Sequence, residues 1–282
     1  MRSALLSCGL VLPALLLASC GGGGASGTAS VSSSSISSAA SSILVFQPVA
    51  SGAIQRRAPR VRLQLPVNIP ILMYHYIKPL PPPEDIQGTD LTVTPETFAA
   101  HLDWLTEHGY QTIDFADIVS GRTLPPKPVI LTFDDGYEDA YTTVAPMLNT
   151  RGMTGVFYIV TSFIGKPGYL DWDQLTAMHA GGMELGAHSL WHANLHKLES
   201  SLHEKQILPS IETLQNNFDI NVDSFAYPFG KYKDQDMEIL RTASVPFAVT
   251  TEHRIAEPTD DPLLLPRLRI KNKSRIETVL EP

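Results

Sequence analysis

Short apolar runs rich in β-branched and aromatic residues alternate with amphipathic segments from about Val67 to the end of the chain. The runs predict strands at 69–77, 111–115, 128–135, 154–160, 183–189, 224–230, 246–252 and 265–270. The segments between many of them predict helices over 95–109, 140–152, 172–182, 198–218 and 235–244. Such alternation indicates an α/β fold, in which crossover helices join the strands of a parallel sheet. Seven or eight strands favour a barrel close to the (β/α)8 type, with an open doubly wound sheet as the alternative.

The first 20 residues have the pattern of an export signal. Arg2 precedes an apolar stretch over 5–17, which is short for a membrane-spanning helix. The stretch leads into "LASC", which is similar to the lipobox of bacterial lipoproteins and makes Cys20 the expected lipidation site. Lipid on Cys20 would anchor the chain to a membrane without spanning it. Because Gly21 rather than aspartate follows, we expect the outer membrane, facing the periplasm or the cell surface, with another cell-envelope membrane as the alternative.

Residues 21–66 are rich in glycine, serine and alanine, as in "GGGGASGTASVSSSSISSAASS". Such a segment buries too little apolar surface to offset the entropy cost of ordering it, so we predict a flexible tether. The predicted organisation is therefore a signal peptide (1–20), a tether (21–66) and a single folded domain (67–282).

Composition excludes several classes of function. The chain has two cysteines, Cys8 within the predicted signal and Cys20 at its end, so the folded domain offers no thiol. This excludes a disulfide framework, a cysteine nucleophile and a cysteine-ligated zinc site. The formal net charge of −8 argues against a nucleic-acid partner.

Polar residues capable of chemistry gather at the ends of the predicted strands. The run "VILTFDDG" contains Asp134 and Asp135, two adjacent carboxylates whose mutual repulsion needs a compensating partner. His188 comes at the end of the strand predicted at 183–189. In a (β/α)8 barrel the active site lies at the carboxyl ends of the strands. We therefore expect these side chains to converge on one face of the barrel.

Three histidines, His188, His192 and His196, are spaced four residues apart. If the segment after the strand is helical, this spacing places the imidazoles on one face, where they suit a divalent metal. Two histidines and one carboxylate leave coordination positions open for water and substrate, as a hydrolytic metal requires. One aspartate would then bind the metal, and the other would take a proton from the attacking water.

These residues resemble the motifs of the polysaccharide deacetylases, the family 4 carbohydrate esterases with a NodB-homology domain. Residues 132–136 read Thr-Phe-Asp-Asp-Gly, and residues 188–192 have the pattern His-Ser-x-x-His. The resemblance covers 67–282 and implies a distorted (β/α)7–8 barrel as the catalytic domain. It also implies that Asp134 is the general base and that the metal ligands are Asp135, His188 and His192. Because His196 matches no ligand of the family, a three-histidine site is the minor alternative.

Other motifs of the family are incomplete in this chain. The family's Arg-Pro-Pro-Tyr corresponds to "AYPFG" at 226–230, where Ala226 stands in place of the arginine that helps to orient the base. The Leu-x-His motif that supplies a general acid is not evident, since "LLLPRLRI" offers arginines instead. These departures look similar to the branch that deacetylates exported poly-N-acetylglucosamine. His75, at the end of the first predicted strand, is the first candidate for the acid, and His253 is the second.

The resemblance implies a metal-dependent hydrolase that removes N-acetyl groups from an N-acetylglucosamine-containing polysaccharide and releases acetate. Zinc is the first metal expected, with cobalt or nickel as alternatives. The backbone amide of Phe229 would face the developing oxyanion. Aromatic side chains expected to contact the sugar are those of Trp191, Tyr227, Phe229 and Tyr232. Two alternatives remain open: an O-acetyl ester deacetylase acting on a glycan such as xylan, and a glycan-binding lipoprotein that has lost catalysis.

Overall fold

The computed structural model describes residues 63–280. The predicted signal peptide, Cys20 and nearly all of the predicted tether lie outside these residues, so the predictions made for them stay predictions.

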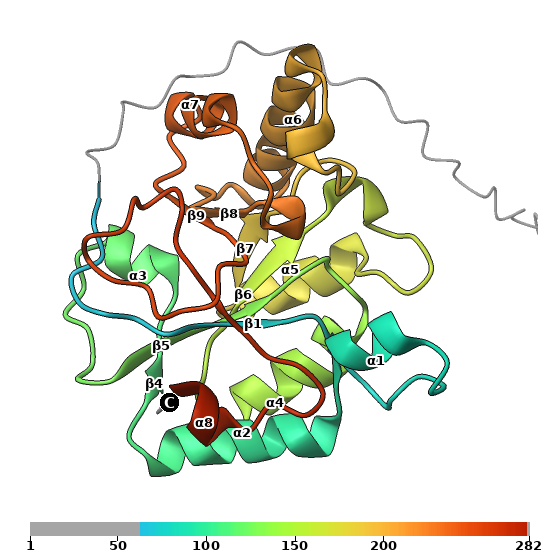
Figure 1. Cartoon of the computed structure of the whole chain (residues 1–282), viewed down its shortest axis with the longest axis vertical. Coiled ribbons are helices and arrows are strands. Elements are labelled where there is room, and N and C mark those ends of the chain that lie inside the picture. Colours follow the sequence, from blue (N-terminus) through green and yellow to red (C-terminus); the bar gives the residue numbers. More distant parts are fainter. Residues whose placement is uncertain (1–62, 281–282) are drawn as a thin grey trace, which may run out of the picture. The chain divides into compact units, whose positions relative to one another are not determined.

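A sheet of eight parallel strands forms the centre of the described chain (Figure 1). Its strands are β1 (Ile71–Tyr74), β4 (Gln111–Thr112), β5 (Pro128–Phe133), β6 (Val156–Ile159), β7 (Glu184–Ala187), β8 (Ser224–Ala226), β9 (Phe247–Val249) and β10 (Leu268–Arg269). They follow the order β10-β1-β5-β6-β7-β8-β9, and β4 pairs with β5 outside this path. A separate parallel pair joins β2 (Tyr76–Ile77) to β3 (Thr92–Val93).

The two edges of the sheet meet through the segment that precedes β10. The amide of Thr250, after β9, donates to the carbonyl of Leu265 (2.8 Å), and the amide of Leu265 donates to the carbonyl of Ala248 (2.9 Å). Three residues later the same segment pairs with β1. The sheet therefore curls into the predicted distorted (β/α) barrel within a single domain. The open doubly wound alternative is wrong, because such a sheet reverses its strand order at a switch point and this one does not.

Helices follow the strands as the alternation predicts. The α-helices are α1 (Ile86–Leu91), α2 (Pro95–Glu107), α3 (Phe115–Val119), α4 (Ala145–Asn149), α5 (Trp172–Ala180), α6 (Ser200–Phe218), α7 (Asp234–Thr242) and α8 (Ile276–Leu280). A π-helical turn, η1 (Ala140–Val144), leads into α4, and 3₁₀ turns occur at η2 (Thr161–Phe163), η3 (Leu195–Lys197) and η4 (Pro228–Gly230). Within the part of the chain that the structure describes, no helix has the length and apolar character needed to cross a membrane.

Local sequence signals set several of these boundaries. Thr94 caps α2 by accepting the amide of Thr97 (3.3 Å), and a proline occupies the first helical position. The strand predicted at 111–115 pairs only over Gln111–Thr112, because Asp114 accepts the amide of Asp117 (2.8 Å) and starts α3 there. Gly109, after α2, adopts the left-handed φ of +77° that ends a helix readily only with glycine.

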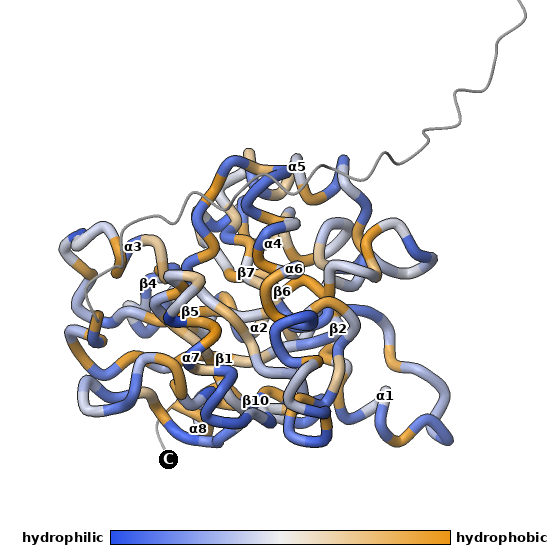
Figure 2. Tube along the Cα trace, turned by 90° about the horizontal axis from the view of Figure 1, so that it is seen from above, coloured by the Kyte–Doolittle hydropathy of each residue, from blue (hydrophilic) through white to orange (hydrophobic). Residues whose placement is uncertain are grey.

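Alternate residues of the strands supply two apolar layers. On β5, Ile130 packs inside the barrel and Leu131 packs under the helices, as the two-residue period of a strand requires. Leu65 is buried in the inner layer with Ile69, two residues before the domain start predicted at Val67. In Figure 2 hydrophilic residues mark the outer loops, whereas hydrophobic residues concentrate on the elements that pack together.

Candidate active site

The predicted convergence of Asp134, Asp135 and His188 is present in the structure. The two aspartates directly follow β5, and His188 directly follows β7, so all three stand at the carboxyl ends of parallel strands. All three side chains are buried, with exposed fractions of 5%, 8% and 2%. Asp134, Asp135 and His188 line one cavity of about 410 Å³, together with His75 and His192.

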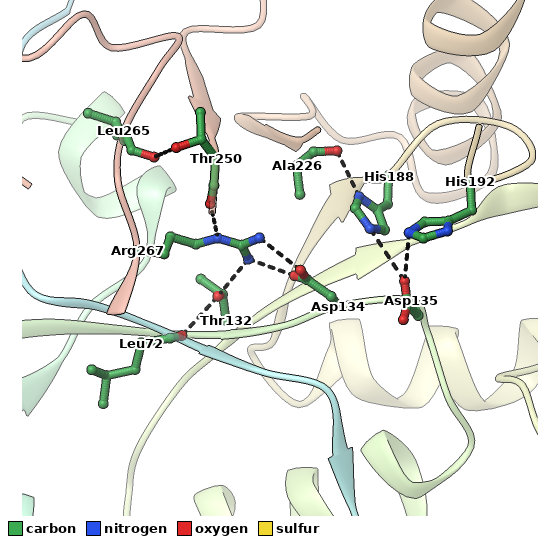
Figure 3. A network of polar contacts seen from close by, with 10 residues as sticks. All are labelled: Leu72, Thr132, Asp134, Asp135, His188, His192, Ala226, Thr250, Leu265 and Arg267. Carbon is green, nitrogen blue, oxygen red and sulfur yellow. Dashed lines mark hydrogen bonds and ion pairs between the residues drawn. The ribbon is translucent and has the colours of Figure 1, made fainter. Parts of the chain in front are cut away.

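Arg267 holds Asp134 by a two-point ion pair (Figure 3). Its Nη1 donates to Oδ1 of Asp134 (2.6 Å) and its Nη2 donates to Oδ2 (2.8 Å). Nη1 also donates to the hydroxyl of Thr132 (3.0 Å), and Nε donates to the carbonyl of Thr250 (2.9 Å). The guanidinium lies over the ring of Tyr158, 5.6 Å from its centroid. Four of the five N–H groups of this buried cation are therefore engaged.

Sequence reasoning missed the role of Arg267. We interpreted Ala226 as the loss of the arginine that orients the base, and we interpreted "LLLPRLRI" only as the absence of a histidine. Arg267 belongs to the segment that closes the barrel, which carries its side chain from the far edge of the sheet to the end of β5. A charged residue inside an apolar, strand-like run was the signal, since a buried arginine needs a carboxylate partner.

The Arg267 contact sets the charge state of the predicted base. Burial alone would raise the pKa of Asp134, but the charge and hydrogen bonds of Arg267 outweigh burial and keep this pKa below its usual value. Asp134 is therefore ionised at neutral pH. This is the form in which a carboxylate accepts a proton.

Asp135, His188 and His192 form the predicted three-ligand cluster. Oδ1 of Asp135 lies 3.4 Å from Nε2 of His188 and 3.2 Å from Nε2 of His192. The three ligand atoms all lie within 4.8 Å of one another, as the ligands of one ion would. Among residues 63–280 this is the sole grouping of histidine, cysteine and acidic side chains with such geometry.

The unsatisfied polar atoms of this cluster fit a metal cation. Nδ1 of His188 lies 2.7 Å from the carbonyl of Ala226, which can only accept, so this nitrogen carries the proton when the ring is in the neutral form that binds a metal. The lone pair on Nε2 then faces Oδ1 of Asp135, which is buried without a hydrogen-bond partner in the described chain. Two acceptors facing each other in a buried site repel unless a cation lies between them.

The electrostatic field at the cluster also favours a cation. Burial would raise the pKa of Asp135, yet attraction to His188, His75 and His192 holds this pKa well below its usual value. Burial opposes charge on His188, but the two aspartates raise its pKa. Burial and the neighbouring His188 lower the pKa of His192 to about 4, so His192 is neutral at pH 7, as a metal ligand must be.

The loop that carries His192 is not helical, contrary to the conditional prediction. Ser189 and His192 both adopt left-handed backbone conformations, with φ of +63° and +55°, which interrupt any helix. His196 is exposed within η3, and its Nδ1 lies 3.4 Å from the carbonyl of Tyr232 rather than near Asp135. The three-histidine alternative is therefore wrong, and the cluster consists of one aspartate and two histidines.

The two histidines considered for the general acid lie in different surroundings. His75 lines the cavity with Asp134, and its Nδ1 is buried without a hydrogen-bond partner among residues 63–280. Burial lowers the pKa of His75 below its usual value. His253 is exposed, and its Nδ1 accepts the backbone amide of Arg269 (3.0 Å).

The aromatic residues considered for sugar contact divide into exposed and buried ones. Trp191 and Phe229 are 64% and 53% exposed, and the ring of Phe229 packs 4.6 Å from that of His192 at the cavity. Tyr227 is fully buried between Phe225 and Tyr232, with no ring face left for a sugar. The structure thus contradicts the substrate contact predicted for Tyr227. Tyr232, partly buried beside it, lines a neighbouring polar cavity instead.

Aromatic residues that the sequence did not single out form one wall of the cavity. Tyr76 stacks on Tyr137 with ring centroids 3.9 Å apart, and Tyr137 packs 5.2 Å from Tyr169. Phe163 extends the series, 4.8 Å from Tyr169. All four line the cavity, although they come from three separate loops or strands, so their grouping could not be predicted from local pattern.

Comparison with known proteins relates these features to one family. The polysaccharide deacetylase family model matches residues 121–248, a stretch that includes both predicted motifs. The chain is 28% identical over 214 residues to a putative polysaccharide deacetylase of Bacillus subtilis, covering 74% of each sequence. It is 22% identical over 235 residues to the poly-β-1,6-N-acetyl-D-glucosamine N-deacetylase of Staphylococcus epidermidis, covering 74% of this chain and 81% of that one.

A solved structure agrees with this placement. The Streptococcus pyogenes deacetylase PplD, in complex with acetate, superposes with a TM-score of 0.71 and 28% identity, over 77% of this chain and 98% of that one. The similarity therefore extends over nearly the whole of that enzyme, and its barrel is the one described above. With its motif residues gathered at the carboxyl ends of the strands, the chain matches the polysaccharide deacetylase family model over 121–248 and resembles deacetylases over about three quarters of its length.

Proposed function

We propose that this chain hydrolyses the acetamide of N-acetylglucosamine units in a polysaccharide and releases acetate. The observation that carries the proposal lies at the end of β5, where Asp134 is held by Arg267 and the adjacent Asp135 meets His188 and His192. A base beside a set of metal ligands is what hydrolysis of an unactivated amide needs. Similarity to staphylococcal poly-β-1,6-N-acetyl-D-glucosamine N-deacetylases, at 22% and 21% identity, supports this bond and this sugar.

The residues of the cluster would hold a divalent cation through Asp135, His188 and His192. Such a cation supplies Lewis-acid chemistry, polarising the acetyl carbonyl and making water more acidic. Asp134 then accepts the proton of the attacking water. Arg267 occupies one hydrogen-bonding site on each Asp134 oxygen and fixes the plane of the carboxylate, so that its remaining lone pairs serve the reaction.

Protonation of the leaving amine is assigned to His75. Its unpartnered Nδ1 and its place in the cavity beside Asp134 support this role. Because burial lowers the pKa of His75, the resting ring is neutral and must take up a proton on the enzyme before passing it to the amine. His253 is the second candidate, although it is exposed and does not line the cavity.

The rim of the cavity supplies the remaining substrate contacts of the proposal. The backbone amide of Phe229 is assigned to the developing oxyanion, on a residue whose φ of +59° sets it in a sharp turn after β8. The ring of Phe229, which lines the cavity, and the exposed ring of Trp191, next to His192 in the sequence, are assigned to the sugar, since exposed aromatic faces bind apolar sugar faces.

The metal and the cellular location are further parts of the proposal. Zinc comes first because two histidines and a carboxylate form a common open zinc site, and cobalt or nickel are the alternatives. Export and anchoring through lipid on Cys20, at the outer membrane, are proposed from the N-terminal sequence alone.

The test is acetate release from N-acetylglucosamine oligomers by the protein after chelation and addition of zinc, cobalt or nickel. We expect metal-dependent release that is lost in Asp134→Asn. No release with any metal, from protein that still binds one, would contradict the proposal. Acetylated xylan serves as the second substrate. Acetate release from xylan alone would show that the enzyme hydrolyses an ester rather than an amide.

The binding-only alternative loses its main support in the structure. It rested on the arginine missing at Ala226 and on an unassigned acid. Arg267 now contacts Asp134 as that arginine would, and the metal-ligand set is complete. A carboxylate buried with an arginine is costly to maintain, and a glycan-binding surface has no need of it.

A further inference from the structure

Arg269 stands out among the arginines of the described chain because it has no ion pair. Every other arginine in residues 63–280 pairs with a carboxylate within 4.0 Å: Arg122, Arg151, Arg241, Arg254, Arg267 and Arg275. Arg269 makes no such contact within this range, and its Nε is buried without a hydrogen-bond partner there. Its backbone amide donates to Nδ1 of His253 (3.0 Å), and within the described chain its guanidinium is left free for another partner.

The position of Arg269 directs it to the catalytic cavity. It lies two residues after Arg267, and residues two apart on a strand point to the same face. Arg267 reaches Asp134, whereas Arg269 is one step nearer the carboxyl end of β10 and lines the cavity with Asp134, Asp135 and His75. An unpaired guanidinium therefore faces the space that the proposed substrate must enter.

The acids of the cavity do not neutralise this charge. Asp134 is bound by Arg267, and Asp135 is surrounded by His188 and His192. Asp85 also lines the cavity, but it caps α1 by accepting the amide of Gly88 (2.8 Å) and forms no ion pair with Arg269. A glycan that fills the cavity would remove water from Arg269, and an unpaired charge without water is costly.

We propose that Arg269 determines specificity by binding an oxyanion, a phosphate or a carboxylate, carried by the acetylated glycan beside the sugar that loses its acetyl group. This inference rests on the proposed function and narrows its substrate class. A planar guanidinium pairs with both kinds of oxyanion through two parallel hydrogen bonds. A wholly neutral polymer would leave the charge of Arg269 without a counter-ion.

The test measures binding without turnover, on the full chain after chelation of metals. Titration calorimetry compares N-acetylglucosamine with N-acetylglucosamine 1-phosphate and 6-phosphate, and with N-acetylmuramic acid, which carries a carboxylate. We expect one or more of the anionic sugars to bind at least ~10-fold more tightly than the neutral sugar, as charge-assisted pairing to arginine predicts. Tighter binding of a sugar phosphate would identify phosphate as the recognised group, and tighter binding of N-acetylmuramic acid would identify carboxylate.

Two variants make the assignment specific. Arg269→Gln should bring the affinities for the anionic and neutral sugars to within about twofold of each other. Arg269→Lys keeps the charge but not the planar pair of N–H donors, so it should retain part of the preference. Arg254→Gln is the matched control, because Arg254 is already paired with Asp260 and should leave the preference unchanged.

Three results would overturn the inference. The first is equal affinity of the unsubstituted protein for neutral and anionic sugars. The second is a preference that survives in Arg269→Gln, and the third is a preference that arises only after zinc is added and does not depend on Arg269; both would place the anion elsewhere. Acetate release is measured separately, so its absence would refute the proposed function without altering the binding comparison.

Discussion

Arg267 and Asp134, 133 positions apart in the sequence, form an ion pair with N···O distances of 2.6 and 2.8 Å inside the barrel. Their side chains are 0% and 5% exposed. The same segment that closes the sheet between β9 and β1 thus also delivers the counter-ion of the base. Barrel closure and the charge state of Asp134 are therefore linked through one residue.

Replacing Arg267 by glutamine should reduce both stability and turnover. Loss of one partner from a buried ion pair typically costs ~3–5 kcal/mol of the free energy of unfolding. Turnover should fall about 10²-fold or more, because the base loses the group that orients and ionises it. Urea unfolding and acetate release check the two effects. Arg267→Lys should recover part of both, and a glutamine variant with normal turnover would show that Arg267 does not act on the base.

Substituting the two adjacent aspartates one at a time separates metal binding from proton transfer. Asp135→Ala should lose the metal, because Asp135 is the carboxylate of the three-ligand cluster. Asp134→Asn should keep the metal and lose ~10²–10⁴-fold in turnover, the usual contribution of a general base. Metal content by mass spectrometry after dialysis is the measurement. Full metal loading in both variants would refute the ligand assignment.

The histidines of the loop after β7 should differ sharply in their effect on metal affinity. His192→Ala removes a proposed ligand and should weaken metal binding by more than the ~10- to 100-fold typical of an outer-shell partner. His196→Ala should bind metal as the unsubstituted protein does, because His196 contacts the carbonyl of Tyr232 instead. Competition against a chromophoric chelator gives both affinities. Equal losses in the two variants would revive the three-histidine site.

Gly186, which has no side chain, leaves room for the ring of Tyr158, over which the guanidinium of Arg267 lies. A Cβ at position 186 would come within 2.5 Å of two ring carbons of Tyr158, which is fully buried. Gly186→Ala should therefore cost ~1–3 kcal/mol through overpacking and should lower turnover by displacing Tyr158 and Arg267. Combining it with Tyr158→Leu removes the clash, so the double variant should be more stable than the sum of the two single losses predicts. Strict additivity would argue against this packing.

Stability should fall with rising pH because of Glu184, at the start of β7. Burial, with the nearby Asp114 carboxylate, raises the pKa of Glu184 well above its usual value of 4.5. The folded protein thus holds this proton more tightly than the unfolded chain does. Its contribution to stability is complete below the unfolded pKa and is lost as the pH rises through the folded pKa.

Glu184→Gln isolates this contribution. Glutamine can still accept the amide of Ala116 and can donate to the hydroxyl of Ser224, the two partners of the carboxylate. The variant should gain stability relative to the unsubstituted protein at pH 8 but not at pH 4, measured by urea unfolding at both values. A difference between the two proteins that does not change with pH would contradict the assignment.

The sequence by itself determined the features that depend on neighbours along the chain. The alternation of apolar runs and amphipathic segments predicted the parallel barrel, because strand and helix periods are local. Asp134, Asp135 and His188 were found because they directly follow strands, and the carboxyl ends of parallel strands meet at one face; His192 was found by its spacing from His188 and its motif.

Only the tertiary structure decided which distant residues complete the site. Arg267 reaches Asp134 because the sheet closes on itself, and no local pattern reports the register of that closure. Tyr227 is buried against Phe225 and Tyr232, and His196 is turned away because left-handed turns at Ser189 and His192 redirect the chain after β7. Spacing along the sequence gives side-chain direction only while the backbone stays regular, and at the ends of these strands it does not.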